Sequence, residues 1–243
     1  MKITAVRGVP LRCACEPISD ALSTSRARQA LLVLLDTDTG LQGIGEAFTY
    51  GAPLAVMKYL VENTLGPKLI GRDPADIDGI WQTLYISTLA SGRRSMTLGA
   101  ISGIDIALWD LKGKCEHKPI AALLGGTRDR IPSYASGGFY AHGKGLDGLR
   151  RELEGYMQKG YTDAKIKIGR NLDRPHAPLK VLGITEDTVT VEEDWQRIRA
   201  AKEVVGGPSG GGYQRQLGPC RRAGKRTPSG GGRCLLAGGA HPF

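Results

Sequence analysis

Alternation of apolar and polar residues dominates the start of the chain. Residues 2–12 alternate well enough to predict a strand, and a loop is expected from there to about Arg28. The stretch ALLVLLDTDTGLQGIGEAFTY then predicts a β-hairpin, with an apolar strand, a turn at Asp36–Gly40 and a return strand that contains Gly43 and Gly45. These spaced glycines resemble a dinucleotide-binding loop. That loop joins a strand to a helix, whereas these glycines lie inside a strand, so a Rossmann fold is not expected.

Helical periodicity replaces this alternation from about Ala52. A cap at Asp73 followed by Pro74 at the first helical position predicts the start of one helix. The clearest helix has an apolar stripe at helical spacing and is expected to end near Lys112–Gly113; the stripe consists of Ile101, Ile104, Leu108 and Leu111. The segment PIAALLGG adds a short helical turn that paired glycines stop. A sheet followed by helices predicts an α+β domain over residues 1–126.

Strands and helices alternate from residue 127 onward. The strand IPSYASGGF precedes the helix LRRELEGYMQKG, whose buried side is expected to carry Leu149, Leu153 and Tyr156. The strand AKIKIG precedes the helix EEDWQRIRAAKEVV, and the residues expected to face inward there are Trp195, Ile198 and Val205. Two such units over residues 127–206 predict the start of a (β/α) TIM-type barrel. A closed barrel needs eight units, so the barrel is expected to be incomplete.

Two lysines on one predicted strand are candidate catalytic residues. Side chains alternate along a strand, so Lys165 and Lys167 share one face and Ile166 and Ile168 the other. An edge strand with its lysines in water explains the pattern without any function. On an interior barrel strand, burial and mutual repulsion would lower the lysine pKa values. One lysine could then be neutral near pH 7 and act as a base toward a carbon acid beside a carboxylate, with a metal ion stabilising the enediolate.

Basic charge is concentrated at the end of the chain. The net charge is +9, but six basic residues and no acidic residue follow Gly206, which leaves +3 for residues 1–206; the six are Arg215, Arg221, Arg222, Lys225, Arg226 and Arg233. Non-specific nucleic-acid binding by an Arg/Gly tail is therefore an alternative function. The rest of the chain shows neither a basic stripe nor an aromatic platform, so nucleic acid is not the expected partner.

Cysteine usage and hydropathy indicate the compartment. The chain has five cysteines, and no second pair matches Cys13 and Cys15 for a zinc site, which indicates reduced thiols. There is no secretory leader and no apolar run near ~18 residues, so no membrane partner is expected. Together these features predict a cytoplasmic protein.

Several motifs in order resemble the enolase superfamily, most closely its mandelate racemase/muconate-lactonising branch. They are MKITAVR, GIGE at Gly43–Glu46, SGIDIALWDLKGK at Ser102–Lys114, PIAALLGG at Pro119–Gly126 and KIKIG at Lys165–Gly169. The resemblance covers residues 1–169 and again 192–206. It implies an N-terminal capping domain, followed by a barrel.

The resemblance also implies a chemistry. Members of this family are Mg²⁺-dependent enzymes that abstract the proton α to a carboxylate, in racemisation, dehydration of sugar acids or cycloisomerisation. The likeness here is to sugar-acid dehydratases and galactarolactone cycloisomerases. By resemblance Lys167 corresponds to the general base and Lys165 to its electrostatic partner near the substrate carboxylate. The loop around Cys13–Ala27 corresponds to a region that closes over substrate. A small-molecule carboxylate substrate and a homo-oligomer are the partners that the resemblance implies.

The carboxylates of the family's metal site are missing from the chain. They are expected on the next three strands, first in Asp-x-Asn and then in Trp-x-Glu-Glu-Pro, because Mg²⁺ prefers oxygen ligands. After Gly206 the sequence contains no Asp or Glu. The last thirty-seven residues, Gly207–Phe243, therefore occupy the place of the first two metal motifs without supplying either.

A shift of one base is compatible with both motifs. Residues Leu235–His241 can be written CTG CTG GCT GGA GGA GCC CAC, which gives Cys-Trp-Leu-Glu-Glu-Pro when the first base is dropped. In the same frame Gly212–Leu217 permits Asp-Thr-Asn-Ala-Asn-Trp, and the two motifs lie 26 codons apart. We therefore expect residues 207–243 to be an out-of-frame, disordered basic tail. A chain truncated in this way is expected to bind no Mg²⁺ and to be inactive; the remaining alternative is a non-catalytic capping-domain fragment.

Overall fold

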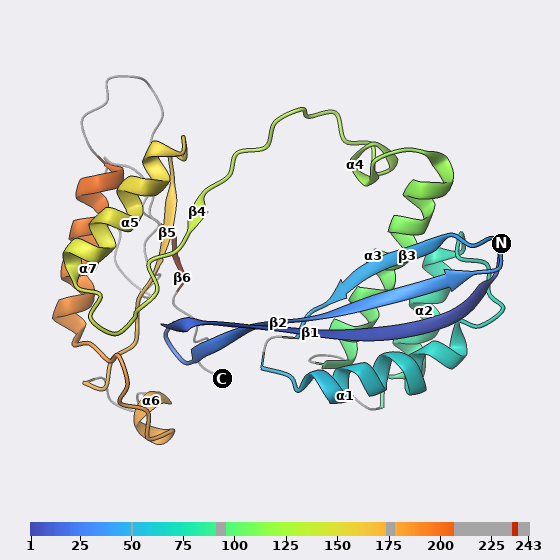
Figure 1. Ribbon diagram of the computed structural model, residues 1–243, viewed down its shortest axis with the longest axis horizontal. Helices are drawn as coiled ribbons and strands as arrows, with labels where there is room; N and C mark the ends of the chain where they lie inside the picture. Colours follow the sequence, from blue (N-terminus) through green and yellow to red (C-terminus); the bar gives the residue numbers. More distant parts are fainter. Residues whose placement is uncertain (50, 91–95, 174–177, 207–234, 238–243) are drawn as a thin grey trace. The chain divides into compact units, whose positions relative to one another are not determined.

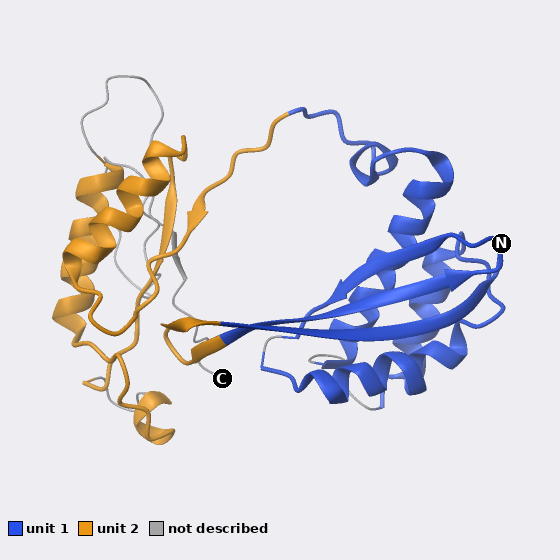
Figure 2. Cartoon of the chain, in the orientation of Figure 1, with its two compact units in different colours: residues 1–14, 27–129 blue, residues 15–26, 130–243 orange. Residues whose placement is uncertain are grey.

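The computed structural model describes residues 1–49, 51–90, 96–173, 178–206 and 235–237. The chain divides into two compact units (Figure 2). Unit 1 consists of residues 1–14 and 27–129, and unit 2 of residues 15–26 and 130–243. The division predicted from sequence at residue 126 placed residues 15–26 with the first unit, whereas their contacts place them with the second. None of the described helices is both long and apolar enough to span a bilayer.

Unit 1 begins with a three-stranded sheet in the order β1-β2-β3. Its strands are β1 (Ile3–Ser19), β2 (Thr24–Thr37) and β3 (Gln42–Ala47). β2 and β3 are antiparallel, with Leu31 opposite Ala47 and Asp36 opposite Gln42, as the hairpin pattern predicts. The loop expected up to Arg28 is wrong, because β1 continues to Ser19 and β2 starts at Thr24. Polar residues on both faces of this stretch hide the alternation, while the ladder between two long strands still satisfies their backbone groups.

Helices follow the sheet in unit 1 and cover one of its faces (Figure 1). They are α1 (Leu54–Tyr59), a π-helical segment (Leu60–Leu65), a 3₁₀ turn (Gly66–Lys68), α2 (Ile77–Ser87), α3 (Met96–Glu116) and α4 (Ile120–Leu123). The predicted start at Asp73–Pro74 is wrong: Asp76 is the cap of α2, and its carboxylate accepts a hydrogen bond from the Gly79 amide at 3.2 Å. The clearest predicted helix is present as α3, but it runs to Glu116, beyond the predicted end at Gly113.

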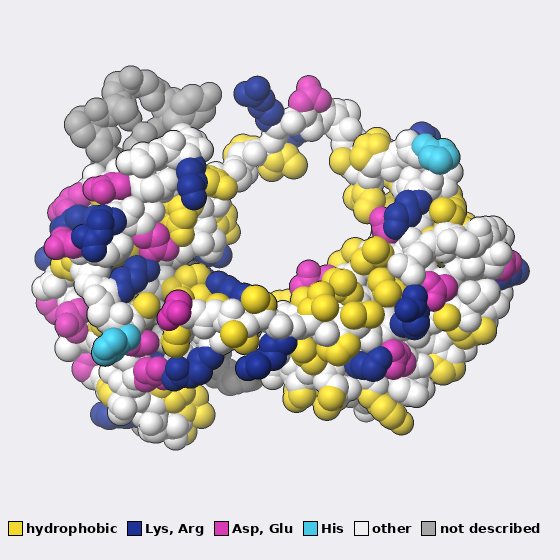
Figure 3. Space-filling model, in the orientation of Figure 1, with side chains coloured by type: hydrophobic (Ala, Val, Ile, Leu, Met, Phe, Trp, Pro, Cys, Tyr) yellow, Lys and Arg dark blue, Asp and Glu magenta, His cyan; other side chains and the backbone are white. Residues whose placement is uncertain are grey.

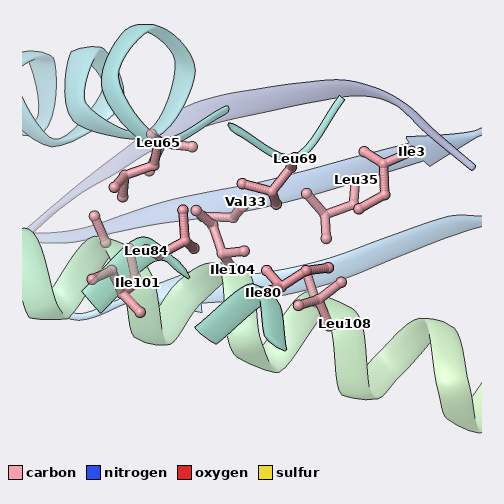
Figure 4. Packing of buried hydrophobic residues seen from close by; sticks show 14 of the residues in the cluster. Ile3, Val33, Leu35, Leu65, Leu69, Ile80, Leu84, Ile101, Ile104 and Leu108 are labelled. Atoms are coloured by element: carbon pink, nitrogen blue, oxygen red, sulfur yellow. The ribbon is translucent and has the colours of Figure 1, made fainter. Parts of the chain in front are cut away.

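The core of unit 1 lies between the sheet and the helices (Figure 4). The apolar stripe of α3 that the sequence predicts is buried throughout, with Ile101, Ile104, Leu108 and Leu111 each at most 1% exposed. Side chains from β1 and β2 and from the segments before α3 meet this stripe; those labelled in Figure 4 are Ile3, Val33, Leu35, Leu65, Leu69, Ile80 and Leu84. Helix and sheet thus share one apolar layer.

The glycines of β3 allow α3 to approach the sheet closely. A Cβ atom at Gly45 would lie 2.0 Å from the Gly103 carbonyl oxygen, and one at Gly43 would lie 2.3 Å from the Ala107 carbonyl oxygen. Any side chain at these positions would force the helix away. The glycine spacing that resembles a dinucleotide loop is therefore a packing feature, as its place inside a strand indicates.

The described part of unit 2 contains a small parallel sheet and three helices. The sheet has the order β4-β5-β6, with β4 (Ala135–Ser136), β5 (Ala164–Lys167) and β6 (Leu235–Ala237). The helices are α5 (Leu146–Gln158), α6 (Pro178–Val181) and α7 (Val191–Val205). The order β4-α5-β5-α7 gives the two predicted βα units, although the predicted strand IPSYASGGF is reduced to two residues. The described residues form no closed barrel.

The helix α7 buries only part of the face that the sequence predicted. It begins with a capping box between Thr190 and Glu193. Trp195 was expected to face inward but is 53% exposed. Val205 is buried as predicted, and Ile198 packs against the core. The stripe also buries Asp194 and Arg197, which follow helical spacing with Val205. Two charged residues on this stripe obscured it, because charged side chains are seldom buried without partners.

The tail contains one strand where disorder was expected. The backbone of Leu235–Ala237 forms β6, which pairs in parallel with Lys165–Lys167 of β5. The expectation is therefore wrong for these three residues, because the free edge of β5 offers unpaired backbone groups to an extended segment. The rest of the expected tail, residues 207–234 and 238–243, lies outside the described residues.

Candidate functional site: the lysine strand of unit 2

The candidate site is built on β5. Ile166 is fully buried against α5 and α7, together with Ala164 and Ile168. Lys165 and Lys167 lie on the other face of the strand and are half-buried. The alternation that the sequence predicts is present, and it brings the two ammonium groups to one side of the sheet.

Aromatic rings, and not carboxylates, accompany the two lysines. The Lys165 Nζ atom lies 5.3 Å from the centroid of the Tyr134 ring and donates a long hydrogen bond of 3.5 Å to its hydroxyl oxygen. The Lys167 Nζ atom lies 5.1 Å from the centroid of the Phe139 ring. Within the described residues neither lysine forms an ion pair. Cation–π contacts hold the two amines in place without an ion pair.

Burial lowers the pKa of Lys167, and the neighbouring charge of Lys165 lowers it further. The carboxylate of Asp20 and Tyr134 oppose this change, but the pKa still lies below the usual value for lysine. Both causes disfavour the ammonium form, so the neutral amine of Lys167 is more populated than that of an ordinary surface lysine. An amine of this kind can accept a proton, and its charged neighbour can hold an anion.

The segment that carries Phe139 is fixed by Lys144 and Glu152. Lys144 donates to the Phe139 carbonyl oxygen at 3.0 Å and forms an ion pair with the Glu152 carboxylate. That carboxylate also accepts hydrogen bonds from the Gly138 amide at 3.1 Å and from the Tyr156 hydroxyl at 2.8 Å. Burial by itself would raise the pKa of Glu152, but the bonds from Lys144 and Tyr156 outweigh it and keep the pKa below its usual range. The ring beneath Lys167 therefore has a rigid support.

A second polar cluster lies at the carboxyl end of β5, around Asp194. Its carboxylate accepts hydrogen bonds from the Tyr140 hydroxyl at 2.5 Å, the Asn171 side-chain amide at 2.6 Å and the Gly169 backbone amide at 2.8 Å. The Arg197 guanidinium lies 4.3 Å from the centroid of the Tyr140 ring and donates to a backbone carbonyl at 2.6 Å. Burial, together with the hydrogen bond to Asp194, raises the pKa of Tyr140 far above its usual value.

This cluster ties the chain after β5 to α7, and the sequence interpretation missed it. The available signal was the spacing of Asp194 and Arg197 with Ala201 and Val205, which places two charged residues on an otherwise apolar helix stripe. Buried charges at such positions need partners, and a tyrosine and an asparagine from neighbouring segments supply them.

The tip of the β1–β2 hairpin lies against the same region. The backbones of Ser19 and Tyr140 exchange two hydrogen bonds, of 2.7 and 2.9 Å. The fully buried Ser19 hydroxyl donates to the Asp187 carboxylate at 3.0 Å. The resemblance implied that residues around Cys13–Ala27 close over a substrate, and within unit 2 part of this stretch lies beside the lysine strand.

Metal ligands are not assembled in this region. Across the residues that the structure describes, no three His, Cys, Asp or Glu side chains are grouped to hold an ion. Asp194 is occupied by three hydrogen-bond donors, and Glu152 is paired with Lys144. The site as described is an amine pair with aromatic supports.

Comparison with known proteins places the fold in a known family. Residues 2–125 match the family described as mandelate racemase / muconate lactonizing enzyme, N-terminal domain. The chain is 37% identical over 172 residues to an arabinonate dehydratase of Saccharolobus solfataricus, covering 71% of this chain and 41% of that protein. It is 34% identical over 209 residues to a D-galactarolactone cycloisomerase of Agrobacterium fabrum, covering 85% and 49%. The chain thus spans less than half the length of either relative.

Solved structures give the same result. A member of the enolase superfamily from Polaromonas sp. JS666 superposes with a TM-score of 0.66 at 31% identity, over 84% of this chain and 57% of that one. A racemase from Streptomyces coelicolor A3(2), solved with bound magnesium, superposes with a TM-score of 0.70 at 25% identity, over 84% and 52%. Both matches extend well beyond residue 125 and therefore include most of unit 2.

Proposed function

The chain belongs to the mandelate racemase/muconate lactonizing enzyme family, and from this membership we propose that its lysine strand is the proton-abstracting part of an active site for sugar acids. The observation that carries the proposal is the placement of Lys165 and Lys167 on one face, with the pKa of Lys167 lowered by burial and by Lys165. Relatives named as a dehydratase and a cycloisomerase, both acting on sugar-derived substrates, support the substrate class.

In the proposed reaction each lysine has a separate role. The neutral amine of Lys167 removes the proton α to the substrate carboxylate, and the electron pair of the broken C–H bond moves into the carboxylate to form an enediolate. The ammonium group of Lys165 lies on the same face and attracts the negative charge that develops. The Phe139 ring keeps the Lys167 side chain in position through the 5.1 Å contact.

Mg²⁺ is the cofactor that we propose for the complete enzyme, in line with the magnesium-bound racemase. It would supply the further charge stabilisation that an enediolate needs. The residues of this chain do not fit the ion, because the described part holds no suitable cluster and residues 207–243 contain no Asp or Glu. We therefore propose that the 243-residue chain binds the metal too weakly for turnover and is inactive.

We further propose that residues from about 207 are translated out of frame. Codons that encode this sequence can spell the two metal motifs of the family in order, 26 codons apart, when the reading frame moves by one base. The nucleotide sequence across codons 203–241 tests this directly. Codons that give Trp-Leu-Glu-Glu-Pro in the shifted frame are the expected result, and any other reading there contradicts the proposal.

Restoring the frame tests the function itself. A gene shifted by one base near codon 206, and translated to its own stop codon, is expected to give Mg²⁺-dependent turnover in a panel of aldonic and aldaric acids. The Lys167→Met variant of that protein should lose activity by at least about a thousandfold, because a general base is removed. Lys159→Met, at the exposed end of α5, serves as the control and should retain activity. Full activity of the Lys167→Met variant would refute the role given to the lysine.

The alternative of nucleic-acid binding gains no support from these comparisons. Neither of the relatives described above is named for it, and the six basic residues of the tail lie outside the described residues. Over α5 and α7, acidic and basic side chains are interspersed (Figure 3), and they include the ion pairs Arg150–Glu203 and Arg199–Glu192. Formation of a homo-oligomer stays a prediction, which sedimentation of the frame-restored protein can test.

A further inference from the structure

Arg170 is a fully buried cation at the end of the lysine strand. It follows Gly169 directly after β5, and none of its side chain is exposed. Its guanidinium donates four hydrogen bonds to neutral oxygens, one to the carbonyl oxygen of Glu186 at 2.9 Å and three to the hairpin tip. The three are the Asp20 carbonyl at 2.9 Å, the Ser23 carbonyl at 3.2 Å and the Thr24 hydroxyl at 2.9 Å.

The choice of arginine is informative because the charge has no carboxylate partner. Within the described residues Arg170 forms no ion pair. A buried guanidinium is unfavourable unless its N–H groups are satisfied. Here one short turn accepts three of the four hydrogen bonds, two at backbone carbonyls and one at the Thr24 hydroxyl. The planar, five-donor head of arginine can reach carbonyls on both sides of that turn, which the single ammonium of lysine cannot do.

The turn held in this way lies against the segment that follows Lys167. A Cβ atom at Gly169 would lie 3.7 Å from the Cβ atom of Ala21, so the tip packs against the end of β5. The carboxylate of Asp20 raises the pKa of Lys167, in opposition to Lys165. The same carboxylate accepts hydrogen bonds from the backbone amides of Leu22 and Ser23, at 2.9 and 2.8 Å, and so shapes the turn.

We infer that Arg170 is a positioning residue that holds the hairpin tip, residues 19–24, against the lysine strand, so that the Asp20 carboxylate stays beside Lys167. Arg170 itself faces the backbone of the tip and contacts neither lysine. The inference deepens the proposed function, because it concerns the same site, but its test requires no turnover. Failure of the proposed reaction would leave it intact.

The first measurement is hydrogen exchange of the tip in the full 243-residue chain. Arg170→Lys keeps the charge but cannot satisfy four acceptors, so the amides of residues 19–24 should exchange at least about tenfold faster. Arg199→Lys makes the same substitution at an exposed arginine of α7 and should leave these amides unchanged. Unchanged exchange in Arg170→Lys overturns the inference.

The second measurement tests whether Arg170 keeps the Asp20 carboxylate close to Lys167. Asp20→Asn keeps an acceptor for the Leu22 amide but removes the charge, so the pKa of Lys167, followed by NMR of the lysine side chain, should fall in the otherwise unchanged protein. In the Arg170→Lys background the same substitution should have little effect, because the tip no longer holds Asp20 there. An equal fall in both backgrounds shows that Arg170 does not position Asp20. A purely structural role for Arg170 would not produce this coupling.

A variant on the opposite side of the contact guards against a folding failure of Arg170→Lys. Thr24→Val removes the hydroxyl that accepts from Arg170 at 2.9 Å and leaves the arginine in place. Exchange of the amides of residues 19–24 should increase severalfold, with residues 149–166 of the unit 2 core unaffected. If Thr24→Val leaves the amides of residues 19–24 as protected from exchange as in the parent chain, and residues 149–166 are equally protected, the inference is contradicted. This holds even if Arg170→Lys cannot be purified.

Discussion

At the residue scale, the chemistry of the site depends on the charge that surrounds one amine. Burial and the charge of Lys165 lower the pKa of Lys167, while the carboxylate of Asp20 raises it. The sequence predicted the pair and the direction of the effect, because alternation along a strand is local. It could not predict Asp20 as the opposing charge, since that residue lies on a distant hairpin.

Removing Lys165 should therefore move the pKa of Lys167 upward. In Lys165→Met the repulsion that disfavours the second ammonium is absent, so the pKa of Lys167 should rise toward the usual value for lysine. Titration of the side chain by NMR measures the change, with Lys159→Met as the control that leaves Lys167 unaffected. A pKa that stays the same in Lys165→Met would show that burial alone lowers it.

Asp105 in unit 1 has a raised pKa, in contrast to the lowered pKa of Lys167. It lines a groove of about 350 Å³ between α2 and α3, together with Ile77, Asp78, Trp81, Gln82 and Trp109. Burial, and to a lesser extent the charge of Asp78, raises the pKa of Asp105. A carboxyl group whose pKa is higher in the folded state binds more protons there, so its ionisation destabilises the fold as the pH rises through the folded pKa.

Asp105→Asn should therefore stabilise the protein at neutral pH. The gain should shrink as the pH falls below the pKa of an unfolded aspartate, because the native side chain is then also neutral. Urea unfolding at pH 7 and near pH 3.5 measures the difference. Asp110→Asn, which weakens a hydrogen bond and an ion pair to Lys114, is the contrasting control and should not stabilise the protein. A pH-independent gain in Asp105→Asn would contradict this account.

At the element scale, close packing of α3 on β3 depends on the absence of side chains. Gly45→Ala should lower the free energy of unfolding by about 3 kcal/mol or more, because its Cβ atom would lie 2.0 Å from the Gly103 carbonyl oxygen. Gly155→Ala in α5 is the matched control: its Cβ atom would meet no atom within 4 Å. Since alanine favours a helix, this control should gain roughly 1 kcal/mol. Denaturant unfolding measures both, and equal effects would refute the packing argument.

The helices also show where local periodicity misleads. The stripe of α3 is apolar and was predicted residue by residue, because its burial needs no partner other than more apolar surface. In α7 the apolar Trp195 lies outside and the charged Asp194 lies inside. Burial of Asp194 depends on donors from Tyr140, Gly169 and Asn171. Such donors come from other segments, so the spacing of residues within the helix does not reveal them.

At the scale of the whole molecule, the residues that the structure describes form two separate cores. The core of unit 1 is built on the sheet and α3, and that of unit 2 on β5, α5 and α7; the two share no residue. Ile104 is fully buried in the first core and Leu153 in the second. Each core can therefore lose stability without the loss of a direct contact in the other.

Ile104→Ala should cost about 3 kcal/mol of stability in unit 1, from lost burial and the cavity that remains. Hydrogen exchange should accelerate in residues 31–36 and 101–111 and stay unchanged in residues 149–166. Leu153→Ala is the reciprocal variant and should give the opposite pattern. Acceleration of both regions by either variant would show that the two cores unfold as one.

By itself the sequence determined the family, the order of sheet and helices, the buried stripe of α3 and the common face of Lys165 and Lys167, because each follows from spacing within a short segment. The absence of Asp and Glu after Gly206 is also a feature of the sequence alone. Only the tertiary structure decided what surrounds the lysines. Arg170 bonds to residues about 150 positions away, and Ser19 bonds to Asp187, 168 positions away. Contacts at such separations depend on how the chain folds back on itself, and no local pattern of residues encodes them.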